Sequence, residues 1–236
     1  MSDKLTDALE AAFEEATKRY KERGFQRRVG FGARPALINV DLANAWTRPG
    51  NPFTCENIDD KVIPAVQKLL VAFRKYNFPV VHVTTCYQVT DRNNPNTDMG
   101  LWHNKIPVEV VAQSNKTLWD IDSRIAPIEG EQVMIKKRAS AFHGTYLAGY
   151  LRAAGVDTVL VTGVTASACV RETVCDALAD GFRPIAVKEA IGDRVPGAVL
   201  WNLFDIDAKF GDVETTERCL QYLDSIGKKV RQPVPA

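Results

Sequence analysis

Four side chains that could take part in chemistry follow separate apolar runs of the sequence. Asp41 follows "ALINV", Lys136 closes "QVMIK", Cys169 comes shortly after "DTVLVTG", and Arg194 comes shortly after "RPIAVKE". A thiol is a good nucleophile, and a carboxylate within reach can carry its proton. A neighbouring lysine stabilises the negative charge that such a pair develops. These residue types suit a reaction in which Cys169 attacks an electrophilic carbon.

The spacing of apolar residues predicts strands and helices that alternate along the chain. The predicted strands are 36–41, 79–85, 132–137, 157–163, 183–189 and 208–214, and the predicted helices are 61–77, 145–155, 167–181, 197–204 and 215–226. This alternation is typical of an α/β fold with a parallel sheet covered on both faces. Ligands of such sheets bind outside the carboxyl ends of the strands. We therefore expect the four side chains to meet at one edge of the sheet.

Two further segments frame this sheet. Residues 1–25 show an amphipathic pattern that ends near Gly24, which predicts a helical arm packed on the body or on another subunit. Residues 86–127 show no regular pattern, and loops of this length usually form lids or contact regions. No linker divides the sequence, so we expect residues 1–236 to form a single domain.

The bulk composition excludes several classes of function. The 236 residues are 45% apolar with a net charge of +1, and they contain no dense basic block. Partners such as nucleic acid or an anionic membrane surface are therefore not expected. The five cysteines are scattered and odd in number, as in a reduced cytoplasmic protein. No apolar run reaches the length of a membrane span, and the charged N-terminus is not a signal peptide.

The chemical interpretation has structural alternatives. Cys169 lies in the first turn of its predicted helix, where the helix dipole and a nearby lysine favour a thiolate. Yet most cysteines are inert core residues, as Cys175 in mid-helix is expected to be. Of Lys136 and Lys137, at least one is expected to point elsewhere, because successive strand side chains alternate between faces. Spacing alone does not decide between the two lysines.

Three sequence motifs, in their order along the chain, resemble those of a known superfamily. The runs "ALINVDLANAW", "IKKRASAFHGTYL" and "VTGVTASACVRETVCDALADGF" resemble the isochorismatase-like cysteine hydrolase superfamily. The resemblance implies a catalytic triad of Asp41, Lys136 and Cys169, and so selects Lys136 over Lys137. The runs "IGDRVPGAV" and "WNLFDIDAKFGDVE" are more specific, and they are similar to those of the N-carbamoylsarcosine amidases. That similarity extends over residues 10–225.

The resemblance implies a three-layer α/β/α sandwich with a six-stranded, mainly parallel sheet, assembled as a homotetramer without a metal or organic cofactor. It implies cleavage of N-carbamoylsarcosine to sarcosine, carbon dioxide and ammonia through a carbamoyl-thioester. The backbone N–H groups of Thr165 and Cys169 would form the oxyanion hole, beside a cis peptide bond between Val164 and Thr165. Arg194 would bind the substrate carboxylate. Its alternative is an ion pair with Asp193 or Glu189.

Departures from the family patterns reduce the number of activities that fit this sequence. "TTCYQVTDRNNPNTD" lacks the histidines of metal-dependent nicotinamidases, and "DLAN" replaces the common "DxQN" beside Asp41. A related amidase, such as a maleamate hydrolase, would carry the same triad. A non-catalytic member of the fold is the third possibility, although a scaffold has no need for a lysine at a strand end beside a thiol at a helix start.

Overall fold

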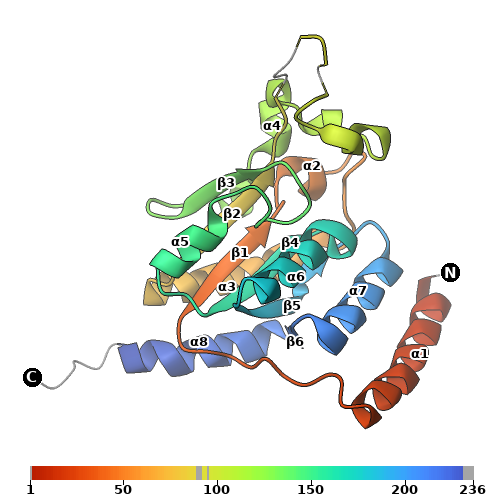
Figure 1. The fold of residues 1–236 in the computed structure, drawn as a ribbon, viewed down its shortest axis with the longest axis vertical. Helices are drawn as coiled ribbons and strands as arrows, with labels where there is room; N and C mark the ends of the chain where they lie inside the picture. The colour runs from red at the N-terminus through yellow and green to blue at the C-terminus, as the bar shows by residue number, and fades with distance from the viewer. Residues whose placement is uncertain (1, 89–91, 95, 231–236) are drawn as a thin grey trace, which may run out of the picture.

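A parallel sheet of six strands lies at the centre of the computed structural model, which describes residues 2–88, 92–94 and 96–230 (Figure 1). The strands are β1 (Pro35–Val40), β2 (Val80–Thr85), β3 (Gln132–Lys136), β4 (Thr158–Val164), β5 (Arg183–Gly192) and β6 (Asp212–Glu214). Their order across the sheet is β3-β2-β1-β4-β5-β6, and all pairs are parallel. The strand order reverses between β1 and β4, and this is the point where such sheets bind ligands.

Helices cover both faces of the sheet. They are α1 (Ser2–Glu22), α2 (Asn44–Thr47), α3 (Ile63–Tyr76), α4 (Lys116–Trp119), α5 (Leu147–Ala153), α6 (Arg171–Ala179), α7 (Pro196–Lys209) and α8 (Thr216–Val230). One face carries α3 and α8, and the other carries α5, α6 and α7. The predicted three-layer α/β/α sandwich is therefore confirmed. No helix of the described segments is both long and apolar enough to cross a membrane.

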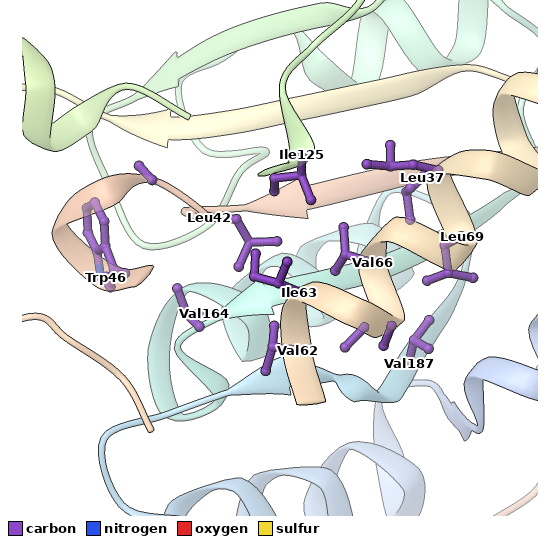
Figure 2. Close-up of a cluster of buried hydrophobic side chains, with 14 of the residues drawn as sticks. Leu37, Leu42, Trp46, Val62, Ile63, Val66, Leu69, Ile125, Val164 and Val187 are labelled. Carbon is purple, nitrogen blue, oxygen red and sulfur yellow. The ribbon is translucent and has the colours of Figure 1, made fainter. Parts of the chain in front are cut away.

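The first core cluster lies between α3 and the sheet (Figure 2). Helix α3 forms because its apolar residues recur at helical spacing, so that Val66 and Leu69 face Leu37 of β1 and Val187 of β5. The helix ends at Tyr76 and is capped by Asn77, which takes the left-handed conformation and donates its backbone N–H to Arg74 O. This packing holds the strands, and therefore the carboxyl ends of β1 and β4, in fixed register.

The N-terminal arm packs on the body of its own chain. Helix α1 lies against α7, where the ring of Phe13 stacks on that of Phe204 with centroids 4.6 Å apart. Trp201 meets Phe13 edge to face but stays 56% exposed. The arm thus covers part of the apolar surface of α7. The helix ends at Glu22, two residues before the predicted end.

Some element boundaries differ from the sequence predictions. Helix α7 continues to Lys209 instead of residue 204, because Leu203 and Ile206 extend its buried face. Strand β6 therefore begins at Asp212 instead of residue 208, and β5 continues to Gly192 instead of residue 189. The segment 86–127 is not wholly irregular. Its described residues contain short helical turns: Gly100–Asn104, Val108–Val111, Gln113–Asn115, α4 and Ser123–Ile125.

Candidate active site

Register brings three polar side chains to the carboxyl end of the sheet. Thr85 and Lys136 are the last residues of β2 and β3, and they lie opposite each other in the ladder. Asp41 directly follows β1 and donates its backbone N–H to Val83 O of the neighbouring strand. Its φ of 50° is left-handed, a conformation that aspartate tolerates better than most residues. The predicted edge therefore forms as the βαβ pattern indicated.

Lys136 contacts both other members of the predicted triad. Its Nζ lies 2.9 Å from Oδ2 of Asp41 and 3.3 Å from Sγ of Cys169. All three side chains are buried, with Asp41 completely enclosed. Lys137 points the other way, to Asp98 and the Cys86 carbonyl. The structure therefore brings Asp41, Lys136 and Cys169 together and leaves Lys137 outside.

The hydrogen bonds of this group leave one carboxylate oxygen open. The three N–H donors of the Lys136 ammonium are directed to Oγ1 of Thr85, the Arg138 carbonyl and Sγ of Cys169. Thr85 in turn donates to Oδ1 of Asp41 at 2.9 Å. Oδ2 of Asp41 accepts no well-aligned hydrogen bond and meets the ammonium only as an ion pair. An oxygen lone pair is therefore available beside the thiol.

The charge state of the thiol differs from the sequence expectation. Burial raises the pKa of Cys169, Lys136 lowers it, and the Asp41 carboxylate raises it again, with a result of about 12. Burial lowers the pKa of Lys136, but Asp41 and Cys169 outweigh this and hold it above its usual value. This direction is opposite to the expectation that the helix start and the lysine favour a thiolate. Burial of Cys169 and the nearby Asp41 carboxylate both favour the protonated thiol, against the effect of Lys136.

The chain that carries Cys169 makes a tight turn after β4. Gly163 has a φ of 110°, and a Cβ there would lie 2.0 Å from the Val40 carbonyl oxygen, so only glycine fits. The peptide bond between Val164 and Thr165 is cis, as the resemblance implied. A single wide helical turn, Ala166–Val170, follows and leads into α6. Cys169 thus lies at the start of a helical segment, as predicted.

Backbone groups of this turn are unevenly paired. The N–H groups of Ala168 and Val170 both donate to the Thr165 carbonyl at 3.1 Å. The N–H of Cys169, which lies between them, makes no bond to that oxygen. Because the wide turn shares one carbonyl between its outer donors, the middle N–H is a candidate donor to a ligand.

A cavity of about 450 Å³ opens onto the thiol. Its walls are largely apolar, and its polar lining comes from a few side chains, as in small-molecule sites. The lining residues are Trp46, Phe53, Thr85, Tyr87, Leu101, Trp102, Lys105, Ile106, Val108, Val111, Lys136, Arg138, Thr165, Ala168, Cys169 and Arg194. Residues 101–111 supply much of the wall, so the 86–127 segment contributes directly to the pocket.

Arg194 lines the cavity without an acidic partner. Its guanidinium donates to the Phe53 carbonyl at 3.4 Å, and no carboxylate among the described residues lies within ion-pair distance. The carboxylate of Asp193 instead accepts backbone and hydroxyl donors, and that of Glu189 accepts two donors from Thr216. In the described part of the chain, Arg194 therefore forms neither of the two alternative ion pairs, with Asp193 or with Glu189.

Sequence reasoning missed three residues of the site. Thr85 joins Lys136 to Asp41, the Tyr87 ring forms a buried wall, and Asp193 connects two turns at the cavity. Thr85 could have been found, because it ends a predicted strand at the same edge. Tyr87 and Asp193 lie in loops, where periodicity gives no orientation. The described residues contain no group of three His, Cys, Asp or Glu side chains that could hold a metal ion.

Comparison with known proteins decides the family. A model of the isochorismatase domain matches residues 35–218. The chain belongs to the isochorismatase family. The resemblance of the three sequence motifs to this family is thereby confirmed, and the family comprises hydrolases with this sheet and helix arrangement.

Several relatives in the isochorismatase family match over most of their length. An N-carbamoylsarcosine amidase of Arthrobacter sp is 53% identical over 224 residues, which are 94% of this chain and 84% of the relative. A maleamate amidohydrolase of Pseudomonas putida is 39% identical over 197 residues, 84% of this chain and 90% of the relative. The crystal structure of an N-carbamoylsarcosine amidase from Thermoplasma acidophilum has a TM-score of 0.63 at 26% identity, covering 78% of this chain and 97% of the other.

Proposed function

We propose that this isochorismatase-family hydrolase is a cysteine amidohydrolase that cleaves N-carbamoylsarcosine. The observation that carries the proposal is the contact of one buried ammonium with both a carboxylate and a thiol, at the base of a cavity that also holds an unpaired arginine. The 53% identical relative, itself an N-carbamoylsarcosine amidase, supports the choice of substrate.

The first half of the reaction forms a covalent intermediate. Sγ of Cys169 attacks the carbamoyl carbon while Oδ2 of Asp41 takes the thiol proton. Lys136 stays protonated and compensates the negative charge that moves between the sulfur and the carboxylate. The substrate oxygen, now an oxyanion, accepts from the backbone N–H groups of Thr165 and Cys169. Asp41 then gives the proton to the departing ammonia, and the C–N bond breaks.

The second half consumes water. Asp41 is a carboxylate again after ammonia has left, and it removes a proton from a water molecule that attacks the carbamoyl-thioester. The C–S bond breaks, and the thiol recovers its proton from Asp41. The released N-carboxysarcosine loses carbon dioxide and leaves sarcosine. One carboxylate thus serves as base and as acid in both halves, without a histidine.

Substrate selection follows from the cations of the cavity. Arg194 has no acid partner among the described residues, and a guanidinium binds a carboxylate through two parallel hydrogen bonds. The carboxylate of N-carbamoylsarcosine would occupy this position while its carbamoyl group reaches Cys169. Maleamate also joins an amide to a carboxylate, and the 39% identical relative is a maleamate amidohydrolase, so this acid is the second candidate substrate.

Ammonia release from a panel of amides tests the proposal. The panel contains N-carbamoylsarcosine, N-carbamoylglycine, maleamate and nicotinamide, and a coupled assay measures ammonia at neutral pH. We expect the highest kcat/KM with N-carbamoylsarcosine. Faster turnover of maleamate would move the assignment to the second substrate. If none of the four amides is hydrolysed, the proposed amidohydrolase function is contradicted.

We also propose that the active form is a homotetramer in a reducing compartment such as the cytoplasm. All five cysteines are free, which suits a reducing environment. Leu101 at the cavity is 82% exposed, as expected of a residue that a second subunit covers. Light scattering during size-exclusion chromatography decides the assembly. A fully active monomer of 26.1 kDa would contradict a shared pocket.

A further inference from the structure

A second buried carboxylate joins the two turns that line the cavity. Asp193 is 4% exposed and lies in the turn between β5 and α7. Its Oδ2 accepts from the backbone N–H of Ser167 at 2.9 Å and from the Ser167 hydroxyl at 2.7 Å. Its Oδ1 accepts from the backbone N–H of Arg194 at 2.7 Å. Of these donors, one belongs to Arg194, which lines the cavity, and two belong to Ser167, whose neighbours Ala168 and Cys169 line it.

Each connected turn carries one functional group of the cavity. Ser167 lies midway between Thr165 and Cys169 in the turn that presents the nucleophile. Arg194 follows Asp193 directly, and both residues contact the same loop. There the Glu56 N–H donates to the Asp193 carbonyl at 3.0 Å, and the Arg194 guanidinium donates to the Phe53 carbonyl.

We propose that Asp193 is a positioning residue that fixes the carboxylate-binding Arg194 at one distance from the nucleophile turn. The inference rests on the proposed function, because it takes Arg194 as the group that receives the substrate carboxylate. A substrate held at both ends reacts only if the two ends of the site are correctly spaced, and a displacement of about 1 Å can reduce the rate roughly 100-fold.

The chemistry of a carboxylate explains why aspartate occupies this position. An ionised carboxylate only accepts hydrogen bonds, and here it faces three donors. An asparagine amide carries an NH₂ group on one side. If its oxygen accepts from Ser167, its nitrogen faces the N–H of Arg194 and the contact becomes repulsive. Asp193→Asn therefore keeps the size of the side chain but disconnects one of the two turns.

Glu189 provides a matched control from β5, the strand that precedes Asp193. Its Oε2 accepts from the Thr216 N–H at 2.7 Å and from the Thr216 hydroxyl at 2.8 Å, as Asp193 does from Ser167. Thr216 begins α8, and none of the described residues of α8 lines the cavity. Glu189→Gln thus removes a comparable carboxylate from a helix start that has no part in substrate binding.

Steady-state kinetics give the first test. We expect Asp193→Asn to raise KM for N-carbamoylsarcosine about ten-fold, the effect of one charge-assisted hydrogen bond, and to lower kcat less. Glu189→Gln is expected to keep wild-type kcat and KM. In an Arg194→Ala background, Asp193→Asn should raise KM little further, because the two residues act through one contact. Equal effects of Asp193→Asn in both backgrounds would overturn the inference.

Alkylation gives a second test that does not depend on the substrate. Iodoacetate carries a carboxylate and iodoacetamide does not, so the ratio of their rates at Cys169 reports whether Arg194 is correctly placed. Mass spectrometry of the Cys169 peptide measures both rates. We expect the iodoacetate preference to fall about ten-fold in Asp193→Asn and in Arg194→Ala, and to persist in Glu189→Gln.

The outcomes separate this inference from the proposed function. An enzyme that releases no ammonia from N-carbamoylsarcosine but shows the expected alkylation ratios refutes the substrate and keeps the positioning role. Turnover of that substrate with an unchanged ratio in Asp193→Asn overturns the positioning role and keeps the function. If the ratio of the iodoacetate and iodoacetamide rates is unchanged in Arg194→Ala, Arg194 does not bind the carboxylate. The positioning role of Asp193, which acts through Arg194, is then overturned as well. Circular dichroism confirms that each variant is folded.

Discussion

Replacing Asp41 by asparagine should stop turnover and at the same time make Cys169 easier to alkylate. Turnover is lost because an amide cannot accept the thiol proton. Alkylation is faster because the carboxylate that raises the pKa of Cys169 is gone, while Lys136 remains. A site with a preformed thiolate and ammonium would not gain reactivity in this way. The two readouts therefore distinguish a protonated resting thiol from a thiolate.

The magnitude follows from the geometry. Nζ of Lys136 lies 2.9 Å from Oδ2 of Asp41 and 3.3 Å from Sγ of Cys169, so the carboxylate oxygen and the sulfur are at most about 6 Å apart. With an effective dielectric constant of about 20, Coulomb's law gives roughly 2.7 kcal/mol, or about two pKa units. The thiolate fraction rises about 100-fold, and the weaker nucleophilicity of a more acidic thiol cancels about ten-fold of this. The net expectation is alkylation about ten-fold faster.

The assay follows carbamidomethylation of Cys169 by iodoacetamide at pH 8, with ammonia release measured on the same preparations. Asp98→Asn is the matched control, because Asp98 forms its ion pair with Lys137 and is not among the charges that shift the pKa of Cys169. It should leave the alkylation rate unchanged. Slower alkylation in folded Asp41→Asn would refute the reasoning, since it would mean that the carboxylate does not hold the thiol protonated.

Two further predictions concern the nucleophile and acid stability. Cys169→Ser should abolish ammonia release while Cys175→Ala keeps most of it, and equal losses in folded variants would mean that the nucleophile is misassigned. Burial raises the pKa of Asp122, but hydrogen bonds from Arg124 and Thr47 lower it to about 2 from 3.8. The bound carboxylate therefore contributes about 2.5 kcal/mol above pH 5, which is lost as the pH falls from 4 to 2. In urea titrations the stability difference between wild type and Asp122→Asn should shrink by about 1 kcal/mol at pH 3, and a constant difference would contradict it.

The position of the triad could be predicted, because it depends on strand ends. Asp41 and Lys136 each follow an apolar run, and parallel strands end at a common edge. Periodicity left Lys136 and Lys137 equivalent, and the family motif selected the residue that the structure turns toward Cys169. A strand pattern predicts that successive side chains point to opposite faces of the sheet, but it does not predict which of the two faces the active site.

The charge state of the triad could not be predicted, because it depends on distances. The sequence indicates that a thiol, an ammonium and a carboxylate lie near one another, but not which pair is neutralised first. Burial of Cys169 raises its pKa, and Asp41 compensates the charge of Lys136, so the direction of the shift is opposite to the expected one. Asp193 was missed for a similar reason. Its role consists of three hydrogen bonds to two loops, and loop conformation has no periodic signal.

The reacting groups and much of the cavity wall belong to different parts of the chain. Asp41 and Lys136 lie at the ends of strands of the sheet and Cys169 lies in the turn after β4, whereas residues 101–111 line the cavity from a segment with little regular structure. Mutations in that segment can reshape the pocket without disturbing the sheet or the hydrogen bonds of the triad. Substrate preference can therefore diverge during evolution while the bond-breaking chemistry is inherited unchanged. For an engineer, a library confined to residues 101–111 is the economical route to hydrolysis of a different small amide.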